Sequence, residues 1–127
     1  MKIILNNGTE LHPIVAMGST KYVHGASRDT ISFVFPVETS LDEIDAIFTA
    51  ENCERITIFD EEAQYIHEGY TVRAELFRRP EVIVPATDEA DEVVENRVTV
   101  SMSLRTYAET QVAEMQSGLS ALAGVEV

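Results

Sequence analysis

Alternating apolar and polar residues near position 100 constrain the fold more strongly than any other pattern in the chain. Between Arg97 and Arg105, apolar residues at even positions alternate with hydroxyl residues at odd ones: Val98, Val100, Met102 and Leu104 against Thr99, Ser101 and Ser103. Because successive side chains of a β-strand point to opposite faces, we expect a strand with one packed face and one wet face. The fold must therefore supply a core for the even-numbered side chains.

Two runs at the start of the chain predict a β-hairpin. Residues 2–5 and 10–16 flank Asn7-Gly8, which favours the positive backbone angles of a tight turn. Pro13 lacks a backbone donor, so the second run is expected at a sheet edge or at a bulge. Residues 17–29 mix glycine, serine and aspartate with little periodicity, which predicts a surface loop.

Three further runs are expected to form strands. Residues 30–35 alternate, and residues 55–59 and 64–77 enclose an acidic turn, so their β-branched and aromatic content favours a hairpin. A glutamate beside Gly69 interrupts the apolar face of the last run, which predicts a bulge or bend. Residues 80–96 hold two prolines and a run of acidic residues, and we expect a long mobile excursion there.

A capping box predicts one helix inserted among the strands, at about residues 40–50. The hydroxyl of Ser40 is spaced to accept from the backbone amide of Glu43, whose carboxylate reaches back. An apolar stripe follows at helical spacing: Leu41, Ile44, Ile47 and Phe48. Because the strands cluster instead of alternating with helices, the class is α+β: a mainly antiparallel β sheet, sandwich or barrel with this helix inserted.

A second helix is expected at the C-terminal end, over about residues 106–122. Its apolar residues recur at steps of four, three, four and three, the a/d spacing of a short coiled coil: Ala108, Val112, Met115, Leu119 and Leu122. Such a stripe needs a cover, which is either the sheet of its own domain or the same stripe of another copy. These five residues are therefore the candidate interface.

The chain length of 127 residues suits one folded unit. Residues 1–105 are expected to form the β-rich domain with its inserted helix. Residues 106–127 then form a helix and tail that belong to the same domain or act as an oligomerisation element. No abrupt change of composition divides the chain further.

The charge balance disfavours two classes of partner. Asp and Glu outnumber Lys and Arg by 22 to 9, and a net charge of −13 repels nucleic acids and anionic membrane surfaces. The opening apolar run is too short for a signal peptide, and no stretch approaches the length of a membrane span. We expect synthesis in the cytoplasm without a signal peptide.

Motifs for catalysis, metals or cofactors are not apparent in the chain. The acidic run at 88–92 lacks the spacing and central glycine of an EF-hand loop, and the three histidines lie on separate segments: His12, His24 and His67. Cys53 is a single cysteine without a thiolate cluster. We therefore expect no metal, no cofactor and no catalytic residue, and a protein that is not an enzyme.

The order of short segments resembles that of small tail and baseplate proteins of phages and prophages of Firmicutes. These segments are Asn-Asn-Gly-Thr at 6–9, Phe-Val-Phe at 33–35, Leu-Asp-Glu-Ile-Asp-Ala-Ile-Phe at 41–48 and Tyr-Ile-His-Glu-Gly-Tyr-Thr-Val-Arg at 65–73. Tail-tube and tail-hub proteins of this group commonly pair a β-sandwich or barrel with a flanking helix. The resemblance implies a place in a virion and carries no site residues with it.

Three function classes follow from these patterns. The first is a non-enzymatic structural or assembly protein, with itself and other tail proteins as partners. The alternative is a module that binds a small ligand or a carbohydrate, although the sequence identifies no small molecule. Its candidate residues are the polar-tipped aromatics Tyr22, His24, Tyr65 and Tyr70. The third is a hydrolase whose site converges from distant segments.

Overall fold

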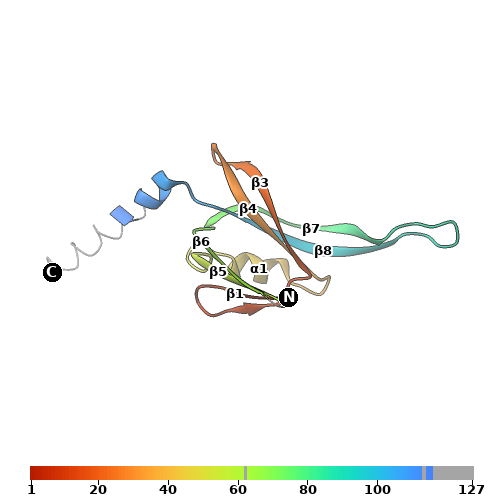
Figure 1. Cartoon of the computed structure of the whole chain (residues 1–127). Helices are drawn as coiled ribbons and strands as arrows, with labels where there is room; N and C mark the ends of the chain where they lie inside the picture. The colour runs from red at the N-terminus through yellow and green to blue at the C-terminus, as the bar shows by residue number, and fades with distance from the viewer. Residues whose placement is uncertain (62, 113, 116–127) are drawn as a thin grey trace.

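A computed structural model describes residues 1–61, 63–112 and 114–115 of the chain. Two antiparallel four-stranded sheets enclose one core (Figure 1). The first sheet has the order β2 (Glu10–Leu11), β1 (Lys2–Ile4), β5 (Arg55–Asp60) and β6 (Ala63–Glu68). The second has the order β3 (Val15–Val23), β4 (Ala26–Phe35), β8 (Val93–Ser103) and β7 (Val72–Val84). The expected α+β class, mainly antiparallel β with an inserted and a C-terminal helix, is confirmed.

The opening hairpin is confirmed, with a shorter second strand than expected. Ile3 pairs with Leu11, and Gly8 takes the positive φ of the turn, at 88°. Pro13 lies between β2 and β3, where the chain leaves the first sheet for the second. The proline therefore marks a change of sheet rather than an edge position within one strand.

The prediction of a surface loop at residues 17–29 is wrong, because these residues belong to a β-hairpin. β3 and β4 pair without a break from Val15↔Val34 to Val23↔Ala26. The turn between them is His24-Gly25, with positive φ at both residues, 47° and 78°, as the preferred two-residue hairpin turn requires. β3 lies at the edge of its sheet and most of its residues are exposed, so small polar residues replace the apolar alternation of a buried strand.

The excursion expected at residues 80–96 is also largely wrong. β7 and β8 stay paired as far as Val84↔Val93, so only residues 85–92 connect them. Pro80 is tolerated because β7 is an edge strand. We call the two-stranded extension at residues 79–97 the arm, and it reaches well beyond the two sheets (Figure 1).

The bend expected near Gly69 proves to be a crossing between sheets. Residues 64–77 are not one strand, because β6 ends at Glu68 in the first sheet and β7 begins at Val72 in the second. Gly69 has a positive φ of 81°, and both its backbone N–H and its carbonyl form hydrogen bonds at this crossing. Its N–H donates to the carbonyl of Glu54 at 3.0 Å, and its carbonyl accepts from the N–H of Arg105 at 2.9 Å.

The helix α1 (Leu41–Ile47) closes one side of the core and is shorter than the expected 40–50. Ser40 caps it as predicted, accepting from the amide of Glu43 at 3.3 Å. The ring of Phe48, just after the helix, lies 5.7 Å from that of Phe33 and 6.0 Å from that of Phe35. Both sheets and the helix thus meet in one core: Ile3, Leu5, Ile31, Phe33, Phe35, Ile44, Phe48, Cys53, Ile56, Ile58, Val98, Val100 and Met102.

The prediction that the odd-numbered residues of β8 between 99 and 103 face solvent is wrong, whereas the prediction that its even-numbered residues between 98 and 102 pack in the core is confirmed. Thr99, Ser101 and Ser103 are all buried, on the face of the second sheet that points away from the core. The sheet curls over this face, because Lys21 on edge strand β3 reaches Glu75 on edge strand β7, with Nζ and Oε1 3.3 Å apart. The two central strands therefore lie at the bottom of a hollow.

Hydroxyl groups bond to one another across β4 and β8 in this hollow. The side-chain oxygens of Ser32 and Ser101 are 2.7 Å apart, and those of Thr30 and Ser103 are also 2.7 Å apart. Thr99 differs, since its hydroxyl is buried and has no hydrogen-bond partner among the described residues. Small hydroxyl residues thus fill the centre of a face that the sequence pattern assigned to solvent.

The C-terminal helix is observed over residues 107–112 and 114–115. Its start is a capping box that the sequence analysis missed. The amide of Glu109 donates to the hydroxyl of Thr106 at 3.2 Å, and the carboxylate of Glu109 accepts from the amide of Thr106 at 2.8 Å. The rest of the expected helix at 106–122 lies outside the described residues.

Candidate functional site

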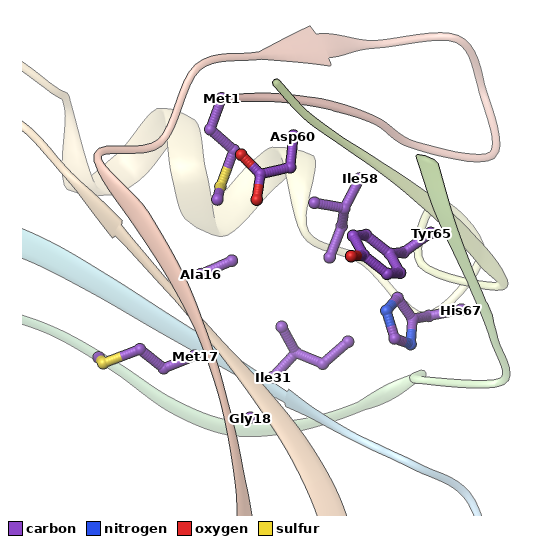
Figure 2. Close-up of a pocket in the computed structure, with 9 residues that line it drawn as sticks. All are labelled: Met1, Ala16, Met17, Gly18, Ile31, Ile58, Asp60, Tyr65 and His67. Carbon is purple, nitrogen blue, oxygen red and sulfur yellow. The ribbon is translucent and has the colours of Figure 1, made fainter. Parts of the chain in front are cut away.

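A cleft opens between the edge strands of the two sheets, where β3 faces β6 (Figure 2). Its volume is about 210 Å³. Figure 2 shows Tyr65 and His67 side by side, directed into the cleft from β6, with Asp60 near its far end. The remaining lining is mostly apolar: Met1, Ala16, Met17, Gly18, Ile31 and Ile58.

The polar side chains Asp60, Tyr65 and His67 give the cleft groups that can form hydrogen bonds. Burial lowers the pKa of His67 below its usual value, so the imidazole is neutral at neutral pH. The ring of His67 meets that of Tyr70 edge-on at 5.5 Å, which fixes its plane. A cleft of this size is smaller than most ligand sites, so only a small molecule or part of one would fit.

The four residues named for a ligand module are not gathered in one place. Tyr65 lines the cleft, and Tyr70 packs against the core beside it. Tyr22 and His24 lie at the end of the β3–β4 hairpin, in a separate hollow with Arg73. The sequence identifies these residues by their polar-tipped rings. It does not show that they lie in two separate places, which depends on the sheet topology.

The described ranges contain no group of three or more His, Cys, Asp or Glu side chains placed to hold a metal. The acidic residues 88–92 lie at the end of the arm. Cys53 is buried in the core, and burial raises the pKa of its thiol to about 12. The thiol therefore stays protonated and unreactive at neutral pH.

No helix within the described part of the chain is both long and apolar enough to cross a membrane.

The predicted interface stripe is exposed wherever the structure describes it. Val112 is 53% exposed and Met115 67% exposed, and Ala108 is exposed as well. Figure 1 shows the helix pointing away from the sheets. The described part of the stripe is thus not covered by the sheets of its own chain, while Leu119 and Leu122 lie outside the described residues.

A buried arginine joins the start of this helix to the β3–β4 hairpin. The side chain of Arg28 is 2% exposed and pairs with the carboxylate of Glu109, with Nη2 3.2 Å from Oε2. The same guanidinium donates to the carbonyls of Val23 at 2.8 Å and Leu104 at 3.1 Å. The hydrogen bond from Arg28 is the main cause that lowers the pKa of Glu109 to about 2.

The arm is a second exposed apolar element, and the sequence analysis missed it. Its four valines are each about half exposed: Val82, Val84, Val93 and Val94. The signal lay in the two runs of β-branched residues at 82–84 and 93–94, on either side of the acidic turn. A composition dominated by proline and acidic residues obscured that signal.

The hollow on the outward face of the second sheet lies at the base of the arm and has a volume of about 480 Å³. Ser32, Val34 and Thr99 form its floor, and the longer side chains of β3 and β7 form its rims. Three of the nine basic residues of this acidic chain line it: Lys21, Arg79 and Arg97.

No protein-family model matches the chain, and neither curated proteins nor solved structures show a significant similarity to it.

Proposed function

We propose that the protein is a non-enzymatic assembly subunit that acts through contacts with copies of itself and with other proteins. The observation that carries this proposal is the exposed apolar stripe of the C-terminal helix. Val112 and Met115 lie at coiled-coil spacing and are more than half exposed. Full burial of such a side chain is worth about 1.5–3 kcal/mol, and burying the exposed part of these two supplies roughly half to two-thirds of that for each.

The stripe selects a second copy of itself as the first partner. A heptad seam is self-complementary, because each a or d side chain fits between side chains of an identical facing helix. The pairing of Arg28 with Glu109 anchors the helix to the sheet domain. A contact between helices would therefore also fix how the domains are arranged around it.

A place in a phage or prophage tail or baseplate is consistent with this mode of action. The resemblance in the order of segments supports it, and so does a β-rich body with two projecting elements. Such a subunit would work in the virion with other tail proteins as partners, after synthesis in the host cytoplasm.

Light scattering coupled to gel filtration tests the assembly proposal. We expect the wild-type mass to be a multiple of the chain mass, and Val112→Asp to lower it, because a charge cannot be buried unpaired in the seam. Gln111→Asp is the matched control, since it adds the same charge to the neighbouring position outside the stripe. A contact with a dissociation constant in the micromolar range would be formed at a protein concentration of about 100 μM. A wild-type protein that remains monomeric at that concentration would refute the proposal.

The second candidate function is binding of a small ligand or a carbohydrate, and the cleft of Figure 2 favours it. Tyr65 and the neutral imidazole of His67 offer polar groups above an apolar wall. NMR titration with glucose, N-acetylglucosamine and phenol would test it. A binder should shift the His67 ring signals in the wild type and bind more weakly to Tyr65→Ala, whereas unshifted signals with all three probes would exclude these ligands.

A further inference from the structure

The outward face of the arm carries its side chains in rows of one kind each. Val98 and Val100 of β8 face the core, so the odd-numbered residues beside them face away from it. The register places these odd-numbered residues of β8 opposite residues of the same character in β7: Arg79↔Arg97, Glu81↔Glu95 and, after a register shift between Val82 and Val84, Val84↔Val93. The row at the base is Phe77↔Thr99, beside the hollow.

These rows leave the charges of a single copy poorly paired. Like charges directly opposite each other destabilise a sheet. Among the described residues, compensation comes from neighbours along each strand, and the guanidinium of Arg79 also lies 4.5 Å from the ring centre of Phe77. Nε of Arg79 lies 3.5 Å from Oε1 of Glu81, and Nη2 of Arg97 lies 4.0 Å from Oε2 of Glu95. Both separations exceed those of charge-assisted hydrogen bonds. Nε of Arg97 is buried and has no hydrogen-bond partner in the described residues.

When a second, identical arm lies against the first in the opposite direction, each row of side chains faces a row of complementary chemistry. The base row pairs aromatic Phe77 with Thr99, and the next rows outward are basic, acidic and apolar. Successive rows lie roughly 7 Å apart along the strands. An identical arm laid face to face and reversed end for end places acidic residues over basic ones, Val84 over Phe77 and Val93 over Thr99. A second copy of this chain is therefore the partner whose charge pattern fits.

We propose that two copies dock through the outward faces of their arms, related by a two-fold axis that crosses the arm between the arginine and glutamate rows. Arg79 of each copy then faces Glu81 of the other, and Arg97 faces Glu95. Val84 and Val93 of each copy enter the hollow of the other beside Phe77. This contact is isologous, and it deepens the proposed assembly function, on which it rests.

Paired charge reversals on the full chain test this contact. We use the Val112→Asp background, in which the helix contact is removed and the arm contact should leave a dimer. Arg79→Glu with Arg97→Glu makes both charged rows acidic, and Glu81→Arg with Glu95→Arg makes both basic. Each double variant alone should weaken the dimer at least about 100-fold, because every facing pair becomes repulsive.

Mixing the two double variants should restore association as a one-to-one heterodimer, since an all-acidic face then meets an all-basic one. Arg55→Glu on β5 is the control for a distant charge change, and circular dichroism checks that each variant is folded. Association of both double variants at wild-type strength, or a folded mixture that stays monomeric, would overturn the arm contact.

The result also separates the two proposals. A wild-type oligomer whose Val112→Asp variant is monomeric before any charge reversal would refute the arm contact and leave helix-driven assembly standing. A wild-type protein that is itself monomeric would refute both.

Discussion

Replacing Phe48 by alanine should be among the most destabilising single changes in the described chain. Phe48 is 1% exposed and its ring contacts two other rings, at 5.7 Å and 6.0 Å. Removing a buried phenylalanine side chain costs about 3–5 kcal/mol, and the two ring pairs place this site toward the upper end. For a chain of this length, a loss of about 4 kcal/mol lowers the melting temperature by about 12–20 °C.

Urea denaturation followed by circular dichroism measures this loss. Phe59→Ala is the matched control, because Phe59 lies in β5 and is only partly buried, with the Nζ of Lys2 4.7 Å from its ring centre. We expect the control to cost well under half of the loss at Phe48. If Phe48→Ala costs less than about 1.5 kcal/mol, below the range for a buried ring, the helix does not seal the core as described.

Three further predictions concern other parts of the chain. Glu109→Gln should lower stability to urea at pH 7, because it leaves the buried charge of Arg28 without its carboxylate. The carboxylate's contribution is present above its usual pKa near 4.5 and lost as the pH falls through about 2, so urea melts of the two proteins should converge over that window. Thr99→Val should leave the free energy of unfolding unchanged or raise it, since the lost hydroxyl has no partner in the described part of the chain, whereas Ser101→Ala should cost about 1 kcal/mol or more. Replacing residues 88–92 by a short turn should lower the melting temperature by less than about 5 °C, because this connection is exposed, and a larger drop would mean that it packs on the body.

The sequence predicted those parts of the fold that depend on local periodicity. The even-numbered residues of β8 were assigned to the core because alternation fixes which side chains share a face. Alternation does not say what covers the other face, so Thr99 and Ser101 were assigned to solvent. Their burial depends on the curl of the sheet, which brings Lys21 to Glu75 across two intervening strands.

Composition is a poor guide to strands that lie at a sheet edge or beyond the core. β3 and the arm carry few buried residues, so the apolar pattern that identifies a strand is weak there. The His24-Gly25 turn and the valines around the acidic connection were the available signals. For the candidate interface, spacing could predict the stripe of the C-terminal helix, but only coordinates show that its described residues are uncovered.

The alternation of the chain between the two sheets has a consequence for how the protein folds. Each sheet consists of two hairpins, and along the chain the hairpins belong to the first, second, first and second sheet in turn. The hairpins form from local contacts, but the central pairing of the second sheet joins Thr30 to Ser103, 73 positions apart. The first sheet is complete once β6 has been synthesised, but the second sheet is not complete until β8 has been synthesised.

Long-range pairing of this kind slows folding, because the entropy of closing a long loop is lost before the contacts form. During synthesis the two N-terminal hairpins would wait with the strand edges of β1 and β4 unpaired, and such edges invite pairing with other chains. If the mature protein associates through the arm and the helix as proposed, unwanted association with other chains is most favoured before β8 has been synthesised.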